Sequence, residues 1–168
     1  MNESSHTDLL QYQPHWKDKF HLENKFLSKI FGDSAIAIEH IGSTSIEGLS
    51  AKSIVDIAVL VENPQIAEEL IAPLLQLGYR YDKENSSSER HLFRKGNPTK
   101  FHLSIAYTDR GSFWERQINF RDYLSNHSDV RDEYAKLKKD LLAEDPTGNN
   151  SYISGKTDFV NKILELAK

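Results

Sequence analysis

The stretch IAIEHIGSTSIEGLSAKSIVDIAVLV, residues 36–61, decides the fold of this chain. Its pattern predicts a short strand, a Gly-Ser turn, a brief helix, a loop that carries Lys52, and a second strand. The second strand is almost continuously apolar, which is typical of a strand covered on both faces, and it contains one carboxylate, Asp56. A lone carboxylate in a buried strand costs several kcal/mol unless it is paired, hydrogen-bonded or bound to a metal. We therefore expect Asp56 to have a partner.

The Gly-Ser turn has the composition of an anion site. Gly42 adopts a positive φ without strain and places no side chain between backbone and ligand, so Ser43 and Thr44 are able to converge on a phosphate oxygen. Asp56 is then a candidate ligand for the Mg²⁺ that such a phosphate carries. The same G-S-T-S turn also fits a capped helix start that binds nothing. Both interpretations remain open from these residues alone.

The composition is that of a globular protein of ordinary domain size. The chain has 168 residues, of which 38% are hydrophobic and 27% charged, so it is long enough to bury a core. It has no cysteine, which excludes disulfides and thiolate zinc sites, and its net charge of −4 disfavours broad nucleic-acid binding. No apolar run approaches the ~20 residues of a membrane span. The polar first ten residues are expected to form a frayed leader without a signal-peptide core, so we expect a cytoplasmic location and no membrane partner.

Helical and strand patterns alternate along the rest of the chain. Residues 14–31 place aromatic and aliphatic side chains at helical spacing, which predicts a buried helix face rather than a base-stacking platform. Pro73 lies inside a later helical pattern, so a kink or a break is expected there. The expected helices are 14–31, from the cap at Asn63 to Gly78, 113–126, 129–143 and 152–167, and the expected strands are 35–41, 53–61, 79–83, 91–95 and 100–107.

These elements predict an α+β fold. Short loops join the strands after Gly78, which indicates antiparallel pairing. The expected architecture is a mixed β-sheet packed with helices, followed by a helical C-terminal third. No linker separates two domains, so we expect one domain over residues 1–168, with a sheet core at about 12–110 and a helical portion at about 111–168.

The second candidate for chemistry is a late strand, FHLSIAY. Two-metal nucleotidyl-transfer sites place carboxylates at positions i and i+2 of one strand, where they share two cations ~3.5–4 Å apart. Here the i+2 position after Asp56 is Ala58. If the late strand lies beside Asp56, His102 is a candidate general base, metal ligand or phosphate donor, and a hydrogen-bonded histidine at a sheet edge explains it equally well. Ser104 is too weak a ligand to replace a carboxylate.

Several lysines are candidates for neutralising a phosphate. Lys52 is placed to steer an anion or is a solvated loop lysine. Tyr134 and Lys138 share an i, i+4 helix face, as do Tyr152 and Lys156. Such faces are most often solvated rims of a helix bundle. If both turned toward the Gly-Ser turn, they would form a basic wall for a polyphosphate.

At this point the residues resemble a known family. The run EHIGSTSIEGLSAKSIVDI, residues 39–57, closely resembles the signature of the GrpB family, also called UPF0157, which is similar to the nucleotidyltransferase superfamily of the polymerase-beta type. The resemblance covers nearly the whole chain. It extends to YQPHW at 12–16, LGYRY at 77–81, NFRDYL at 119–124, EYAKLK at 133–138, and the closing Tyr152 and Lys156 with their apolar helix.

The resemblance implies a nucleotidyltransferase-like fold with Mg²⁺ as cofactor and Asp56 as its ligand. Active members of the wider superfamily join a nucleoside monophosphate to an acceptor hydroxyl or phosphate, and some related domains look fused to dephospho-CoA kinase. This chain departs from the active pattern at Ala58 and at Ser104, where similar sequences often have a second histidine, and each lost metal ligand should raise the barrier by several kcal/mol. The residues expected to bind phosphate or nucleotide are Gly42, Ser43, Thr44, Lys52, Arg121, Lys138, Tyr152 and Lys156.

Two functions follow as hypotheses. The first is a metal-dependent nucleotidyltransferase-like enzyme acting on a small molecule, nucleotide or coenzyme, with Asp56 and His102 as catalytic residues. The second, motivated by Ala58, is a catalytically impaired module that binds a nucleotide or another anion. A small-molecule or nucleotide ligand is the expected partner in both, and no nucleic-acid partner is expected because the chain lacks a basic stripe.

Overall fold

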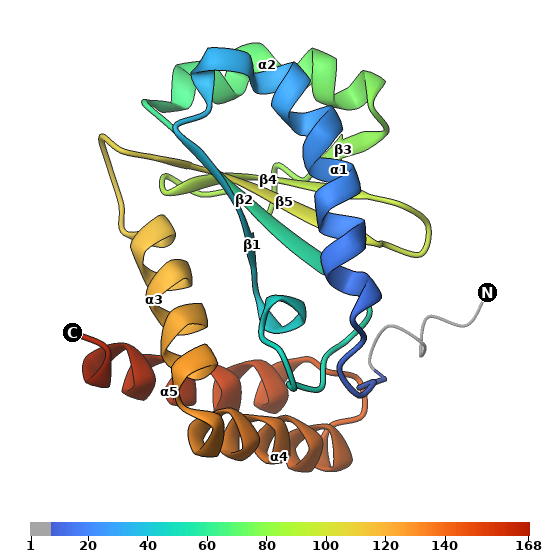
Figure 1. Cartoon of the computed structure of the whole chain (residues 1–168), viewed down its shortest axis with the longest axis vertical. Helices are drawn as coiled ribbons and strands as arrows, with labels where there is room; N and C mark the ends of the chain where they lie inside the picture. Colours follow the sequence, from blue (N-terminus) through green and yellow to red (C-terminus); the bar gives the residue numbers. More distant parts are fainter. Residues whose placement is uncertain (1–7) are drawn as a thin grey trace.

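A five-stranded mixed sheet forms the centre of the computed structural model, which describes residues 8–168 (Figure 1). The sheet order is β1-β2-β5-β4-β3, in which β2 and β5 are parallel and the other neighbours antiparallel. This confirms the predicted α+β class and the antiparallel pairing after Gly78. The strands are β1 (Ala37–Ile41), β2 (Val55–Val61), β3 (Tyr79–Tyr81), β4 (Arg90–Lys95) and β5 (Phe101–Tyr107).

Within residues 8–168, five α-helices accompany the sheet, close to the ranges expected from the sequence. Of the kink or break predicted at Pro73, the break is wrong: the helix continues through this proline to Gln76, and the missing N–H costs it one hydrogen bond. None of the helices within residues 8–168 has both the length and the apolar character that a membrane crossing requires. The helices are α1 (His15–Phe31), α2 (Pro64–Gln76), α3 (Phe113–Asn126), α4 (Ser128–Glu144) and α5 (Asn150–Leu166).

The start of the chain is partly outside this description. Of the expected frayed leader, residues 1–7 lie outside the described residues. At residue 10 the prediction is wrong, because Leu10 exchanges two backbone hydrogen bonds of 2.9 Å with Ala51. This short bridge fastens the segment before α1 to the loop between the Gly-Ser turn and β2.

The main core lies between one face of the sheet and the helices α1 and α2. Alternate residues of β2, from Val55 to Val61, point into it, together with the neighbouring positions of β5. Trp16, Phe20 and Leu27 of α1 are buried here, which confirms that the aromatic stripe is a packing face. The opposite face of the sheet is therefore left to a different set of side chains.

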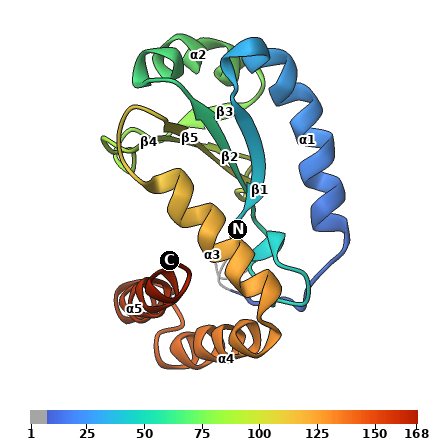
Figure 2. The same cartoon turned by 60° about the vertical axis from the view of Figure 1, so that its left-hand side comes forward.

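A second, smaller core joins the last three helices to the segment after β1. Ile46 and Leu49 of that segment pack with Phe120 of α3, Tyr134 of α4 and Phe159 of α5. Turning the molecule shows α3 along the second face of the sheet and α4 and α5 below it (Figure 2). The Gly-Ser turn consequently lies where the two cores meet.

Candidate functional site

The Gly-Ser turn follows directly from the end of β1. Gly42 has a φ of 72°, a conformation that residues with a Cβ rarely adopt. A Cβ at this position would overlap the carboxylate of Asp56, which lies against the glycine. The brief helix predicted after the turn is only a single 3-10 turn, Ser43–Ser45, since the amides of Ser45 and Ile46 bond back to carbonyl groups three residues earlier. The turn is thus placed by close packing on Asp56, and no long helix adds its dipole.

Thr44 holds this turn against β1 through its side chain. Its buried hydroxyl lies 2.9 Å from Nε2 of His40. The ring of His40 stacks on Phe20 of α1, with ring centroids 5.1 Å apart. Burial lowers the pKa of His40 to about 4, so this histidine is neutral at pH 7. The hydroxyl of Thr44 is engaged in holding the turn, and its role as a phosphate ligand stays a prediction.

Asp56 belongs to a line of hydrogen bonds that crosses three strands. Strand register sets Asp56 beside His102 of β5, and His102 beside Arg94 of β4. Arg94 Nη1 donates to His102 Nε2 over 2.8 Å, so the ring proton resides on Nδ1, which donates to Asp56 Oδ1 over 3.0 Å. Arg94 Nε in turn donates to Asp82 Oδ2 over 2.7 Å. Both nitrogens of His102 are engaged in this arrangement, and the histidine orients Asp56, whose side chain keeps 33% exposure.

Three lysines from separate elements converge beside the same turn, and we call Lys52, Lys138 and Lys156 the lysine cluster. Lys138 of α4 is only 2% exposed, and its amine donates to Ser43 Oγ over 3.0 Å and to a backbone carbonyl over 2.7 Å. Lys52 and Lys156 lie over the ring of Tyr152, at 4.8 and 4.9 Å from its centroid. The Tyr/Lys faces of α4 and α5 therefore turn toward the Gly-Ser turn as a basic wall and are not solvated rims.

The lysine cluster carries an unbalanced charge. Within residues 8–168, no carboxylate forms an ion pair with any of its three amines. Burial, assisted by the charges of Lys156 and Lys52, lowers the pKa of Lys138 to about 7, and Asp56 opposes this only in part. Burial also lowers the pKa of Lys52 and that of Lys156. Such a concentration of positive charge favours the binding of an anion.

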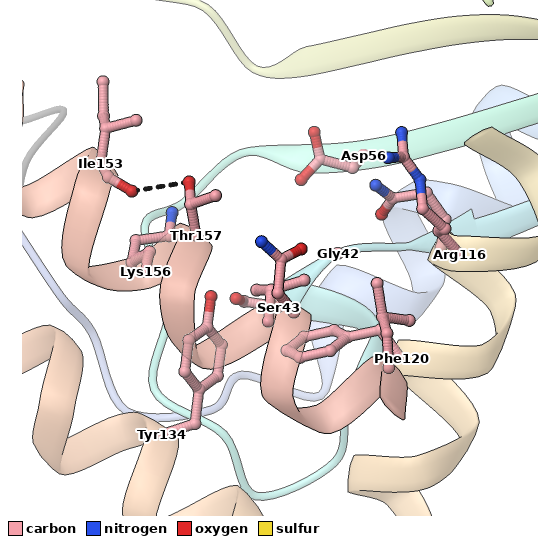
Figure 3. Close-up of a pocket in the computed structure, with 13 residues that line it drawn as sticks. Gly42, Ser43, Asp56, Arg116, Phe120, Tyr134, Ile153, Lys156 and Thr157 are labelled. Atoms are coloured by element: carbon pink, nitrogen blue, oxygen red, sulfur yellow. Dashed lines mark hydrogen bonds between the residues drawn. The ribbon is translucent and has the colours of Figure 1, made fainter. Parts of the chain in front are cut away.

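Two cavities meet at the turn. The larger has a volume of about 410 Å³ and is lined by α3, α4 and α5, whereas the smaller, of about 230 Å³, contains the lysine cluster. Ser43, Asp56 and Lys156 line both cavities. On the side of the larger cavity, Arg116 and Phe120 of α3 lie across from α5 (Figure 3). Asp56 is therefore accessible from two compartments, one strongly basic and one of mixed character.

Asp56 is the one carboxylate among the described residues that line the two cavities, which suits a single magnesium ion and does not suit a pair. Ala58, at the position of a second carboxylate, is buried next to Ser104, whose hydroxyl accepts a hydrogen bond of 2.8 Å from Arg90. Within the described chain, no three His, Asp or Glu side chains are grouped as a metal cage. Magnesium that arrives with a polyphosphate needs only one or two carboxylates, because phosphate oxygens and water complete its shell. The oxygen of Asp56 that faces Gly42 fits that requirement.

The structure gathers nearly all of the site residues that the sequence indicated. Arg121 is apart from them: its guanidinium donates to Glu39 Oε2 and to the carbonyl of His40, both at 3.0 Å, and it lines neither cavity. Sequence reasoning missed Arg94 and Arg116. A signal for Arg94 was present, because Arg90 and Arg94 are four residues apart in β4 and such positions point to the same side of a strand. The predicted residues that line the two cavities are Gly42, Ser43, Thr44, Lys52, Asp56, His102, Lys138, Tyr152 and Lys156.

The fold is of the nucleotidyltransferase-like class. The structure is similar to that of terminal uridylyl transferase 4 from Trypanosoma brucei with bound dUTP, with a TM-score of 0.61, 13% identity, and coverage of 93% of this chain and 54% of that chain. It is also similar to the Cid1 poly(U) polymerase with magnesium and 3'-dATP, with a TM-score of 0.59, 13% identity, and coverage of 86% and 49%. At these identities the likeness establishes the fold alone.

Within that class, the chain belongs to the GrpB family, because the model of the GrpB protein matches residues 6–166. The crystal structure of conserved protein GrpB from Enterococcus faecalis has a TM-score of 0.87 and 33% identity, and the match covers 95% of this chain and 96% of that one. The UPF0157 protein YqkA of Bacillus subtilis is 35% identical over 161 residues, which are 96% of this chain but 47% of YqkA. The chain thus spans about half the length of that relative, and the resemblance carried by residues 39–57 is confirmed.

One relative of lower identity carries the name of an enzyme. The dephospho-CoA kinase of Mycobacterium tuberculosis is 28% identical over 164 residues, and the match covers 89% of this chain and 39% of the kinase. A domain similar to this chain therefore forms part of that longer protein.

Proposed function

We propose that the protein binds a magnesium polyphosphate, such as a nucleoside triphosphate, and transfers its nucleotidyl group to a small-molecule acceptor. The observation that carries the proposal is that the lysine cluster, Asp56 and Ser43 line one cavity, in which the amine of Lys138 donates to Ser43. Three lysine amines, which have no acidic partner within residues 8–168, supply the charge that a triphosphate requires, and a single oriented carboxylate lies at the reacting end.

Each residue has a defined part in this proposal. The lysine cluster neutralises the phosphates and the pyrophosphate that leaves, and Ser43 positions the phosphate nearest Asp56. Asp56 holds the magnesium ion, which when bound withdraws charge from the phosphate oxygens. His102 and Arg94 keep the carboxylate in its orientation.

The transfer itself exchanges one bond for another. The acceptor oxygen forms a bond to the α-phosphorus, the bond to the bridging oxygen of pyrophosphate breaks, and the proton of the acceptor passes to water. Catalysis of this step is mostly charge neutralisation and positioning, both of which the lysine cluster and the Gly-Ser turn are built to provide.

Turnover is tested with labelled nucleoside triphosphates, magnesium and a panel of small acceptors that includes dephospho-CoA and CoA, because of the kinase relative. We expect labelled product with the unmodified protein and with Asp140→Asn, an exposed acid of α4, and none with Asp56→Asn. Product formation that survives Asp56→Asn would sink the proposal.

A second function is favoured by Ala58 and by Ser104, which is engaged by Arg90. In this alternative the same pocket binds a nucleotide or another polyphosphate without turning it over. Calorimetry with ATP, GTP, CoA and tripolyphosphate, with and without magnesium, separates the two. Tight binding without product supports the binding module, and product formation excludes it.

A further inference from the structure

Arg90 of β4 carries a charge that the fold does not balance. Its side chain is partly buried, and the one hydrogen bond that its guanidinium makes within the described chain goes to the hydroxyl of Ser104. The ring of Phe113, at 4.9 Å, covers another side of it. A half-buried guanidinium is costly unless a carboxylate or another anion neutralises it. Burial accordingly lowers the pKa of Arg90, while the charge of Asp56 raises it.

The other arginines near the sheet show what a balanced arrangement looks like. Arg94 pairs with Asp82 at 2.7 Å, and Arg121 pairs with Glu39 at 3.0 Å. Arg80 also lacks an acid within residues 8–168, but it is exposed and water solvates it. Among the arginines of the described residues, Arg90 alone is partly buried and has no acidic side chain as an ion-pair partner.

Strand register places Arg90 on the side of the sheet that carries Asp56. Ser104, which Arg90 touches, lies beside Ala58, and Ala58 lies two residues along β2 from Asp56. Residues two apart on a strand point to the same face and are separated by about 7 Å. Arg90 therefore lies on the face of the sheet that carries Asp56, with its guanidinium on the hydroxyl of Ser104, the neighbour of Ala58.

Arg116 extends this positive region into the larger cavity. It stands on the first turns of α3, lines the cavity together with Asp56, and is directed toward it (Figure 3). Its ion pair with Glu89 is long, at 3.5 Å, and about half exposed, so it holds the guanidinium only weakly. Glu89 makes its shorter bond, 2.7 Å, to the backbone amide of Ser112.

We propose that Arg90 and Arg116 form a second anion subsite, which binds a phosphate or carboxylate group of the acceptor and lies across Asp56 from the lysine cluster. This inference rests on the proposed function, in which the lysine cluster takes the polyphosphate. A guanidinium binds both kinds of oxyanion with paired N–H groups. Its charge also offsets the repulsion between Asp56 and an incoming anionic acceptor, which a neutral acceptor would not need.

The test follows the side-chain Nε–H signals of the arginines by NMR while inorganic phosphate is added to protein saturated with magnesium tripolyphosphate. Tripolyphosphate blocks the lysine cluster, so the remaining effect reports the second subsite. We expect saturable shifts of the Arg90 and Arg116 signals, with a Kd on the order of 1 mM. Arg90→Gln and Arg116→Gln should each weaken binding by about tenfold. A parallel titration with acetate distinguishes a phosphate subsite from a carboxylate subsite.

Arg110→Gln is the matched control, because it removes the same charge from an exposed loop where Arg110 pairs with its neighbour Asp109. Thermal unfolding of each variant, together with Arg90→Lys, which keeps the charge, separates loss of binding from loss of folding. The inference is overturned if neither phosphate nor acetate shifts the two signals saturably, or if both Gln variants bind like Arg110→Gln. Tripolyphosphate binding in the same sample, measured by calorimetry, tests the proposed function separately. Phosphate binding at Arg90 in a protein that does not bind tripolyphosphate would overturn the acceptor role.

Discussion

The two sides of the sheet differ in whether a deeply buried charged side chain has a partner of opposite charge. On the face under α1 and α2, the buried Glu23 accepts hydrogen bonds from Tyr79 at 2.7 Å and from Lys95 at 2.9 Å. Glu23 and Lys95 there form an ion pair. On the other face, Lys138 is as deeply buried, yet its amine contacts a hydroxyl, a carbonyl oxygen and the ring of Tyr134, and it pairs with no carboxylate within residues 8–168.

This difference separates structural charge from charge that awaits a ligand. In a buried ion pair, each charge offsets the desolvation cost of the other. Removal of one partner leaves the other charge buried and uncompensated, which lowers the free energy of unfolding. A buried cation without an acidic partner lowers the stability of the free protein, and a bound anion restores that stability. Such a cation therefore indicates an anion-binding site.

The largest effect on stability is expected from Glu23→Ala. This change leaves Lys95 and Tyr79 without their acceptor, and the free energy of unfolding should fall by about 3–5 kcal/mol. Tripolyphosphate affinity per folded molecule should be unchanged, since the residue lies on the far face of the sheet. Urea denaturation measures the first quantity and calorimetry the second. Glu165→Ala, at an exposed pair with Lys168, is the control. A loss of affinity equal to that of a lysine-cluster variant would break the comparison.

Lys138→Met is expected to produce the reverse pattern. Removal of a charged hydrogen-bond donor should weaken tripolyphosphate binding by about 30-fold, or about 2 kcal/mol, without lowering the free energy of unfolding. Lys139→Met changes the next residue of α4, which is exposed, and should leave both quantities unchanged. If Lys138→Met destabilised the protein as strongly as Glu23→Ala, Lys138 would be a structural residue.

The stability of the free protein should also depend on pH through Lys138. Its pKa is lowered from 10.5 in the unfolded chain to about 7 in the fold, so above pH 7 the unfolded chain binds more protons. Stability contributed by this group is therefore present above pH 10.5, and it is lost as the pH falls through 7. From pH 7 to 9 the unmodified protein should gain about 2 kcal/mol relative to Lys138→Met in urea denaturation. Parallel curves for the two proteins over this range would contradict the assignment.

The smallest effect is expected from Arg94→Gln, which loosens the hydrogen bonds that orient Asp56. The magnesium-dependent part of tripolyphosphate affinity should fall by about fivefold, or about 1 kcal/mol, whereas the affinity without magnesium should not change. Arg80→Gln serves as control, because Arg80 lies beside Arg94 in register and is exposed. Equal losses with and without magnesium would show that Arg94 acts on the whole pocket.

Much of this site could be predicted from the sequence because it lies on continuous stretches. The turn at Gly42 and the strand of Asp56 are adjacent in the chain, and the alternation in FHLSIAY placed His102 on a strand able to lie next to Asp56. Helix α3 was predicted with its observed bounds, 113–126, because apolar spacing and turn residues define both of its ends.

The remainder depends on packing that local sequence does not encode. The i, i+4 spacing of Tyr134 and Lys138 is the same for a solvated rim and for a buried wall, and the direction in which α4 packs decides between them. Arg94 reaches His102 only because β4 pairs with β5 in one register. Arg121 lies in NFRDYL, one of the stretches that carry the family resemblance. Its guanidinium nevertheless pairs with Glu39 of β1 and lines neither cavity.

The contact between Gly42 and Asp56 has a consequence for how this sequence can change over time. The carboxylate of Asp56 fills the space that a Cβ on Gly42 would occupy. A substitution at either position alone meets an obstacle or leaves a gap, so the two positions are expected to vary together or not at all. A variant library that randomises only one of them would sample few folded sites, whereas a paired library would reveal which combinations the turn accepts.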